Sequence, residues 1–179
     1  MNPSSLAVLG VGNILERDDG IAVYAAVFLQ ENFIFDPPVT IVNGGVEGIN
    51  LLNFFTEHDR ILILDALDLD DTPGSIYHIP SHELTGCGIN SGGAHEVGVL
   101  QCIDMLELMG KPLPDSSVLG IVPERVEVGI GLTATLAARF DDYVATAVSA
   151  LQREGIAVNK KPETLLLENI IERFRNPLR

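Results

Sequence analysis

Apolar runs alternate with turn residues along this chain, and each run is typical of a buried strand. An uninterrupted apolar run indicates a strand that is covered on both faces, as in a parallel sheet. We predict such strands over residues 6–9, 39–43, 61–64 and 118–122. A further short run at 75–79 is interpreted as an edge strand that can pair in the antiparallel direction.

Between these runs, apolar residues recur at intervals of three and four, which predicts helices with one buried face. The predicted helices cover 21–29, 48–56, 96–109, 133–153 and 162–174. Thr133 is expected to cap the fourth helix, and Gly155 is expected to end it. Strands alternating with helices are typical of a parallel α/β sheet.

The chain of 179 residues contains no internal repeat, linker or low-complexity segment. We therefore expect a single domain over residues 1–179, with a core at about 6–155 and an extra C-terminal helix at about 162–174. That helix is interpreted as packing on the domain or on a partner.

The acidic charge of the chain excludes two classes of partner. Eleven basic residues against twenty-five acidic ones give a formal net charge of −14, which repels nucleic acid and anionic lipid. The chain start lacks the pattern of a signal peptide, and no apolar run approaches membrane-spanning length. Cys87 and Cys102 match neither a disulfide framework nor a metal clip, so we expect a cytoplasmic protein.

The segment around residues 6–20 combines a strand, a glycine turn and a pair of acids before a helix. One of Asp18 and Asp19 is interpreted as the cap of that helix, which leaves the other acid for chemistry. A dinucleotide-binding loop is disfavoured, because Leu15 occupies its third glycine position and two acids repel a pyrophosphate.

Two further polar residues are expected beside Asp19. Asp65 directly follows the third strand, and His95 follows a loop that has four glycines in residues 85–94. Ligands of open α/β sheets bind at the carboxyl ends of the strands, where these residues are predicted to lie. Two carboxylates and an imidazole suit a divalent metal such as nickel or zinc, or can position water by acid–base chemistry. No motif indicates a covalent nucleophile.

Four motifs in consistent order resemble the nickel-iron hydrogenase maturation proteases. They are GVGNILERDDG at 10–20, LDA at 64–66, the glycine-rich loop with His95, and GIVPE at 120–124. The resemblance runs from about residue 6 to 155. It implies a three-layer α/β/α sandwich around a twisted, mainly parallel, five-stranded sheet.

The resemblance also implies an endopeptidase that removes the C-terminal peptide from the hydrogenase large-subunit precursor after nickel insertion. Asp19, Asp65 and His95 match the family's metal-contacting positions, and Asp19 and Asp65 are the expected catalytic residues, of metal-dependent or aspartic type. Nickel is expected to be carried by the precursor, and the enzyme is expected to be a monomer. Asn43 stands where the family often has Asp, and Ala22 where it often has Gly.

Two other classes stay open at this point. A non-catalytic nickel-binding or delivery module can use the same three ligands without shortening any partner. A nucleotide-binding enzyme of the doubly wound class is the third option, which binding of NAD or ATP distinguishes. The sequence also leaves open whether Glu124 contacts substrate or ends a strand.

Overall fold

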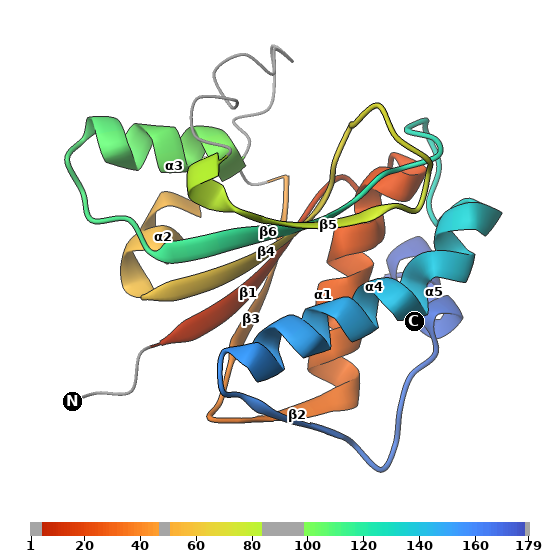
Figure 1. Ribbon diagram of the computed structural model, residues 1–179. Coiled ribbons are helices and arrows are strands. Elements are labelled where there is room, and N and C mark those ends of the chain that lie inside the picture. Colours follow the sequence, from red (N-terminus) through yellow and green to blue (C-terminus); the bar gives the residue numbers. More distant parts are fainter. Residues whose placement is uncertain (1–4, 47–50, 84–98, 178–179) are drawn as a thin grey trace.

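A five-stranded sheet with helices on both faces forms the centre of the molecule (Figure 1). The computed structural model describes residues 5–46, 51–83 and 99–177. The strands of this sheet are β1 (Leu6–Val11), β3 (Thr40–Gly45), β4 (Arg60–Ala66), β5 (Ile76–Pro80) and β6 (Asp115–Ile121). The predicted α/β/α sandwich is therefore confirmed.

The sheet has the spatial order β3-β1-β4-β6-β5. Its first four strands are parallel, and β5 pairs antiparallel with β6 at the edge, as the short run at 75–79 indicated. Because the four parallel strands point the same way, the segments that follow β1, β3, β4 and β6 all leave from one edge of the sheet. We refer to this end of the parallel strands as the carboxyl edge, which is distinct from the lateral edge formed by β5.

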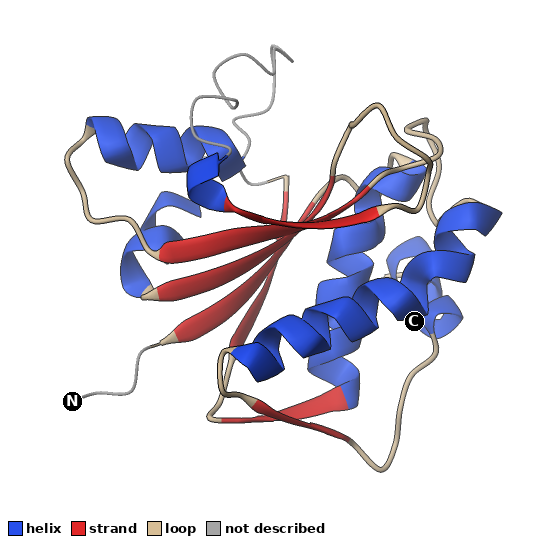
Figure 2. Cartoon of the chain, viewed as in Figure 1, coloured by secondary structure: helices blue, strands red, loops and turns tan. Residues whose placement is uncertain are grey.

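Helices cover the two faces of the sheet unequally (Figure 2). They are α1 (Ile21–Asn32), α2 (Leu52–Glu57), α3 (Val99–Leu108), α4 (Ala134–Arg153) and α5 (Leu167–Arg175), with 3-10 turns η1 (Arg17–Gly20) and η3 (Ser81–Glu83). The helices α1, α4 and α5 lie on one face, and α2 and α3 lie on the other (Figure 1).

Alternate residues of the central strands supply two separate cores. Leu62 and Leu64 of β4 pack with α1 and α4, whereas Ile61 and Ile63 pack with α2 and α3. Side chains of a strand point alternately to its two faces, so a run that is apolar throughout serves both cores. This double burial explains why the strand at 61–64 can be recognised from the sequence.

A second, small sheet pairs β2 (Phe33–Asp36) antiparallel with β7 (Ala157–Lys160). Neither strand was predicted. Both are only four residues long and partly exposed, so neither forms a buried apolar run. Their pairing joins the end of α1 to the segment after α4, which are distant in the sequence.

The C-terminal helix is shorter than predicted, since α5 begins at Leu167 and residues 161–166 are not helical. Asn32, which is buried at the end of α1, holds this segment. Its side-chain N–H group donates to the Leu165 carbonyl at 3.0 Å, and its side-chain oxygen accepts from the Leu165 N–H at 2.6 Å. The backbone groups of Leu165 are therefore bound to a side chain rather than to a helical turn.

The residues predicted to begin and end α4 are confirmed. Thr133 is its N-cap and accepts a hydrogen bond from the Leu136 N–H, and Gly155 follows its last turn with a φ of +85°. Among the helices that the structure describes, none combines the length and apolar character that a membrane span requires.

Candidate functional site

The carboxyl edge carries two of the three residues predicted for the site. Asp65 is the penultimate residue of β4 and lies opposite Gly120 of β6. Asp19 belongs to η1, which follows the neighbouring strand β1 and contacts β4. Both side chains are half-buried. The structure thus brings Asp19 and Asp65 to the same edge from adjacent strands.

The glycine turn after β1 is shaped around Asp19. The Asp19 Oδ2 atom accepts a hydrogen bond of 2.6 Å from the Asn13 N–H. Gly12 has a φ of +139°, and a Cβ atom added there would lie 2.0 Å from the Asp19 carbonyl oxygen. Only glycine allows this approach, so Gly12 sets how close the turn comes to η1.

Asp65 is positioned through its backbone by a buried tyrosine. The Asp65 N–H donates to the Tyr143 hydroxyl at 3.1 Å, and this hydroxyl donates to the Leu119 carbonyl at 2.7 Å. Burial raises the pKa of Tyr143 well above its usual value, and the nearby Asp65 charge raises it further. A neutral tyrosine of α4 therefore ties β4 to β6 beside the carboxylate.

Asp18 has a different role from the predicted one. The N-cap of α1 is Gly20, and no side chain caps that helix, so the capping interpretation of Asp18 and Asp19 is wrong. The Asp18 side chain is fully buried. It accepts hydrogen bonds from the N–H groups of Glu124 (3.0 Å), Arg125 (3.0 Å) and Thr133 (2.8 Å), and from the Thr133 hydroxyl (2.8 Å).

These bonds hold both ends of the segment between β6 and α4. The middle of that segment lies along the segment after β1: the Gly129 N–H donates to the Leu15 carbonyl at 2.8 Å, and the Arg17 N–H donates to the Gly129 carbonyl at 2.7 Å. An ion pair of 2.9 Å joins Arg17 to Glu127. Asp18, which directly precedes Asp19, therefore ties the segment after β6 to η1.

Two other residues discussed from the sequence lie near this edge. The Asn43 side-chain oxygen accepts from the Gly45 N–H at 3.1 Å, so it closes a local turn at the end of β3. The Glu124 side chain is exposed, and its backbone N–H binds Asp18. Glu124 lies three residues beyond the end of β6, and its backbone N–H group contributes to the binding of Asp18.

The third predicted residue, His95, lies outside the described residues, as does the glycine-rich stretch at 85–94. Within residues 5–46, 51–83 and 99–177, no group of three or more His, Cys, Asp or Glu side chains is arranged to hold a metal ion. Asp19 and Asp65 offer carboxylate oxygens, which suit a divalent metal once a further donor joins them.

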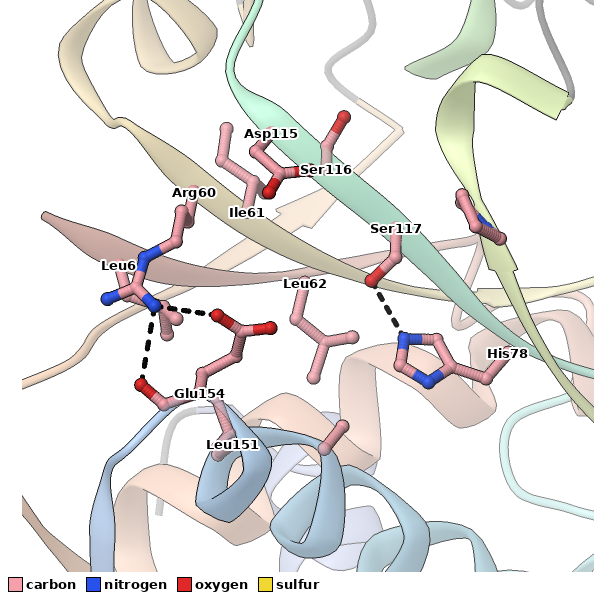
Figure 3. Close-up of a pocket in the computed structure, with 12 residues that line it drawn as sticks. Leu6, Arg60, Ile61, Leu62, His78, Asp115, Ser116, Ser117, Leu151 and Glu154 are labelled. Carbon is pink, nitrogen blue, oxygen red and sulfur yellow. Dashed lines mark hydrogen bonds and ion pairs between the residues drawn. The ribbon is translucent and has the colours of Figure 1, made fainter. Parts of the chain in front are cut away.

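A cavity of about 220 Å³ lies at the opposite, amino edge of the sheet (Figure 3). Leu62 and Leu151 contribute apolar side chains to it. Arg60 pairs with Glu154 across the cavity at 2.6 Å, and the His78 Nε2 atom lies 2.8 Å from the Ser117 hydroxyl. This cavity is separate from the two carboxylates, because it adjoins the starts of β4 and β6 rather than their ends.

Comparison with known proteins relates the chain to one family. The family model described as hydrogenase maturation protease matches residues 23–150. This span includes Asp65 and His95, and it begins just after Asp19.

Individual relatives extend the match to nearly the whole chain. The hydrogenase expression/formation protein HupD of Rhizobium leguminosarum bv. viciae is 30% identical over 169 residues, covering 93% of this chain and 84% of that protein. The hydrogenase 2 maturation protease of Escherichia coli K12 is 30% identical over 152 residues, covering 84% and 93%. The solved structure of the hydrogenase maturating endopeptidase HybD from E. coli is 29% identical, with a TM-score of 0.79 over 88% of this chain and 98% of that one.

Proposed function

The chain belongs to the hydrogenase maturation protease family, and we propose that it removes the C-terminal peptide from the large-subunit precursor of a nickel-iron hydrogenase after nickel insertion. The placement of Asp19 and Asp65 together at the carboxyl edge carries the proposal. Two carboxylates held at one end of the sheet can act on the same peptide bond, one as the general base and the other as the general acid.

Recognition of nickel is the second part of the proposal. The nickel belongs to the precursor and is therefore part of the substrate. Asp19 and Asp65 supply oxygen donors, and His95 supplies an imidazole nitrogen, a set that suits a divalent first-row metal. Contact with these residues signals that nickel insertion is complete, and it brings the peptide bond to the same carboxylates.

Hydrolysis needs a water oxygen to attack the peptide carbonyl carbon while the water loses a proton. In the aspartic type of reaction, the carboxylate of Asp19 or Asp65 takes that proton, and the departing amine receives one as the C–N bond breaks. In the metal-dependent type, the substrate's nickel also polarises the water or the carbonyl. In both cases these two carboxylates hold the reacting groups in place.

Nickel-loaded and nickel-free precursors, mixed separately with the purified protein, test the proposal. We expect the mass of the large subunit to fall only when nickel is present. A non-catalytic nickel-binding module, the alternative considered above, would leave the precursor intact. An unchanged mass of the nickel-loaded precursor would therefore contradict the proposal.

The variants Asp19→Asn and Asp65→Asn test the roles of the two acids. An amide keeps an oxygen donor but cannot take a proton, so we expect cleavage to slow by about a hundredfold or more. Glu57→Gln, an exposed substitution at the end of α2, is the matched control and should cleave at the normal rate. Normal cleavage by both Asn variants would contradict the assignment.

A further inference from the structure

Large apolar side chains are exposed on each of the segments that leave the carboxyl edge. One follows β1, one follows β3, one follows β4, and two follow β6. We call these five residues the apolar rim: Leu15, Val46, Leu69, Val126 and Val128. Exposed apolar side chains gathered at one end of a protein mark a contact surface more often than scattered ones do.

Backbone hydrogen bonds connect the segments that carry the rim. The Gly12 N–H donates to the Gly45 carbonyl at 2.9 Å, which joins the segment after β1 to the end of β3. The Leu67 N–H donates to the Ile121 carbonyl at 2.9 Å, which joins the segment after β4 to β6. With the bonds between Gly129 and the segment after β1, backbone hydrogen bonds link all four segments to one another.

Asp18 holds in place the segment that carries Val128, the most exposed side chain of the rim. Val128 is 90% exposed, and the segment that presents it is fixed by the buried Asp18 carboxylate and by the Arg17–Glu127 ion pair. A loop that is held at both ends loses little freedom when it binds. Val128 is thus exposed to water on a segment whose backbone is held in place.

The charged residues on the rim segments indicate which kind of partner surface would be complementary. Apart from Asp18 and Asp19, the described residues of the rim segments carry six carboxylates and two arginines. The carboxylates belong to Glu16, Asp68, Asp70, Asp71, Glu124 and Glu127, and the arginines are Arg17 and Arg125. A complementary partner presents apolar side chains bordered by basic ones.

We propose that the apolar rim docks the folded large-subunit precursor and thereby brings its nickel site to Asp19 and Asp65. This inference rests on the function proposed above. The rim comes from four separate segments around the two acids, whereas a single extended peptide would need only one groove. The occupant is therefore the folded surface of the precursor, with the bond to be cleaved at its centre.

Matched pairs of exposed residues make the test specific. Val128→Asp alters the rim, and Leu108→Asp alters a side chain of similar exposure (90% against 82%) at the end of α3. Leu15→Asp and Met109→Asp form a second pair, with exposures of 57% and 59%. Since all four side chains are exposed, none of the substitutions should unfold the protein, which thermal denaturation checks.

We expect the rim variants to raise KM for the nickel-loaded precursor about tenfold or more with little change in kcat, because they weaken docking and leave the acids intact. The control variants should stay within about twofold. Equal effects in the rim and control variants would overturn the proposal, as would a loss confined to kcat.

Two further measurements separate this inference from the proposed function. Binding of the intact precursor is titrated directly, so docking is measured even if the wild-type protein cleaves nothing, an outcome that would overturn the proposed function alone. A synthetic peptide with the sequence of the precursor's C-terminal segment is then added as a competitor. We expect no competition; displacement of the precursor by the peptide would overturn the assignment of a folded surface as the occupant.

Discussion

The carboxylate of Asp18 binds Thr133, which lies 115 residues further along the chain, through both the backbone N–H and the hydroxyl. Thr133 in turn caps α4 through its hydroxyl. One buried acid therefore connects the turn before α1 to the start of α4. Asp19, the next residue, is half-buried at the carboxyl edge, so adjacent acids divide the structural role and the proposed chemical role.

Removal of this anchor should destabilise the whole domain. Asp18→Ala removes the acceptor of the Glu124, Arg125 and Thr133 N–H groups, and we expect the free energy of unfolding to fall by about 3–5 kcal/mol. Urea denaturation at neutral pH measures this change. Asp141→Ala, at an exposed position of α4, is the control and should change stability by less than about 0.5 kcal/mol. A cost below about 1 kcal/mol for Asp18→Ala contradicts the anchoring role.

A pair of glycine substitutions separates steric contact from backbone strain. Gly12 and Gly110 both have positive φ angles, but an added Cβ would lie 2.0 Å from the Asp19 carbonyl at Gly12 and would meet nothing within 4 Å at Gly110. Gly110→Ala should cost only the backbone penalty of about 1–2 kcal/mol. Gly12→Ala should cost more and also slow precursor cleavage, because it displaces η1. Denaturation and cleavage assays check both, and equal behaviour of the two variants argues against the steric explanation.

The buried hydroxyl of Tyr143 predicts a pH dependence in alkaline solution. Its pKa is raised in the folded protein, so the unfolded chain loses this proton first as the pH rises. Its contribution to stability is thus complete below pH 10 and is lost progressively above it. Tyr143→Phe removes this contribution, so its free energy of unfolding should decline less steeply between about pH 10 and 11.

The same variant has a cost at neutral pH. Without the hydroxyl, the Leu119 carbonyl loses its donor, and we expect a loss of about 1–3 kcal/mol. Denaturant titrations of both proteins at several pH values measure the two effects together. Parallel pH profiles for wild type and Tyr143→Phe would show that this tyrosine does not produce the alkaline decline.

Asn32 predicts a local effect on the C-terminal segment. Its side chain binds both backbone groups of Leu165, and Asn32→Ala removes these bonds. We expect faster amide hydrogen exchange and proteolysis over residues 161–166, with smaller changes in the central sheet. Gln30→Ala, near the end of α1, is the control because only its backbone carbonyl, which accepts from Lys161, takes part in the contact. Equal protection of residues 161–166 in Asn32→Ala and wild type would contradict this role.

The elements that the sequence predicted well are those whose pattern reflects burial alone. The run at 61–64 is apolar throughout because β4 contributes to cores on both faces. The short strand β2 was missed because its partly exposed residues become a strand only through pairing with β7. The start of α5 was misplaced for a similar reason, since Asn32 binds the backbone of Leu165 from another element.

Local sequence patterns were sufficient to predict the fold class and the edge at which Asp19 and Asp65 lie, because apolar runs and turn residues act locally and parallel strands share a direction. The anchoring role of Asp18 and the pairing of the segments that carry Leu15 and Val128 became visible only in the folded structure. Those roles arise from hydrogen bonds between distant segments, and the partners of a buried carboxylate leave no local pattern in the sequence.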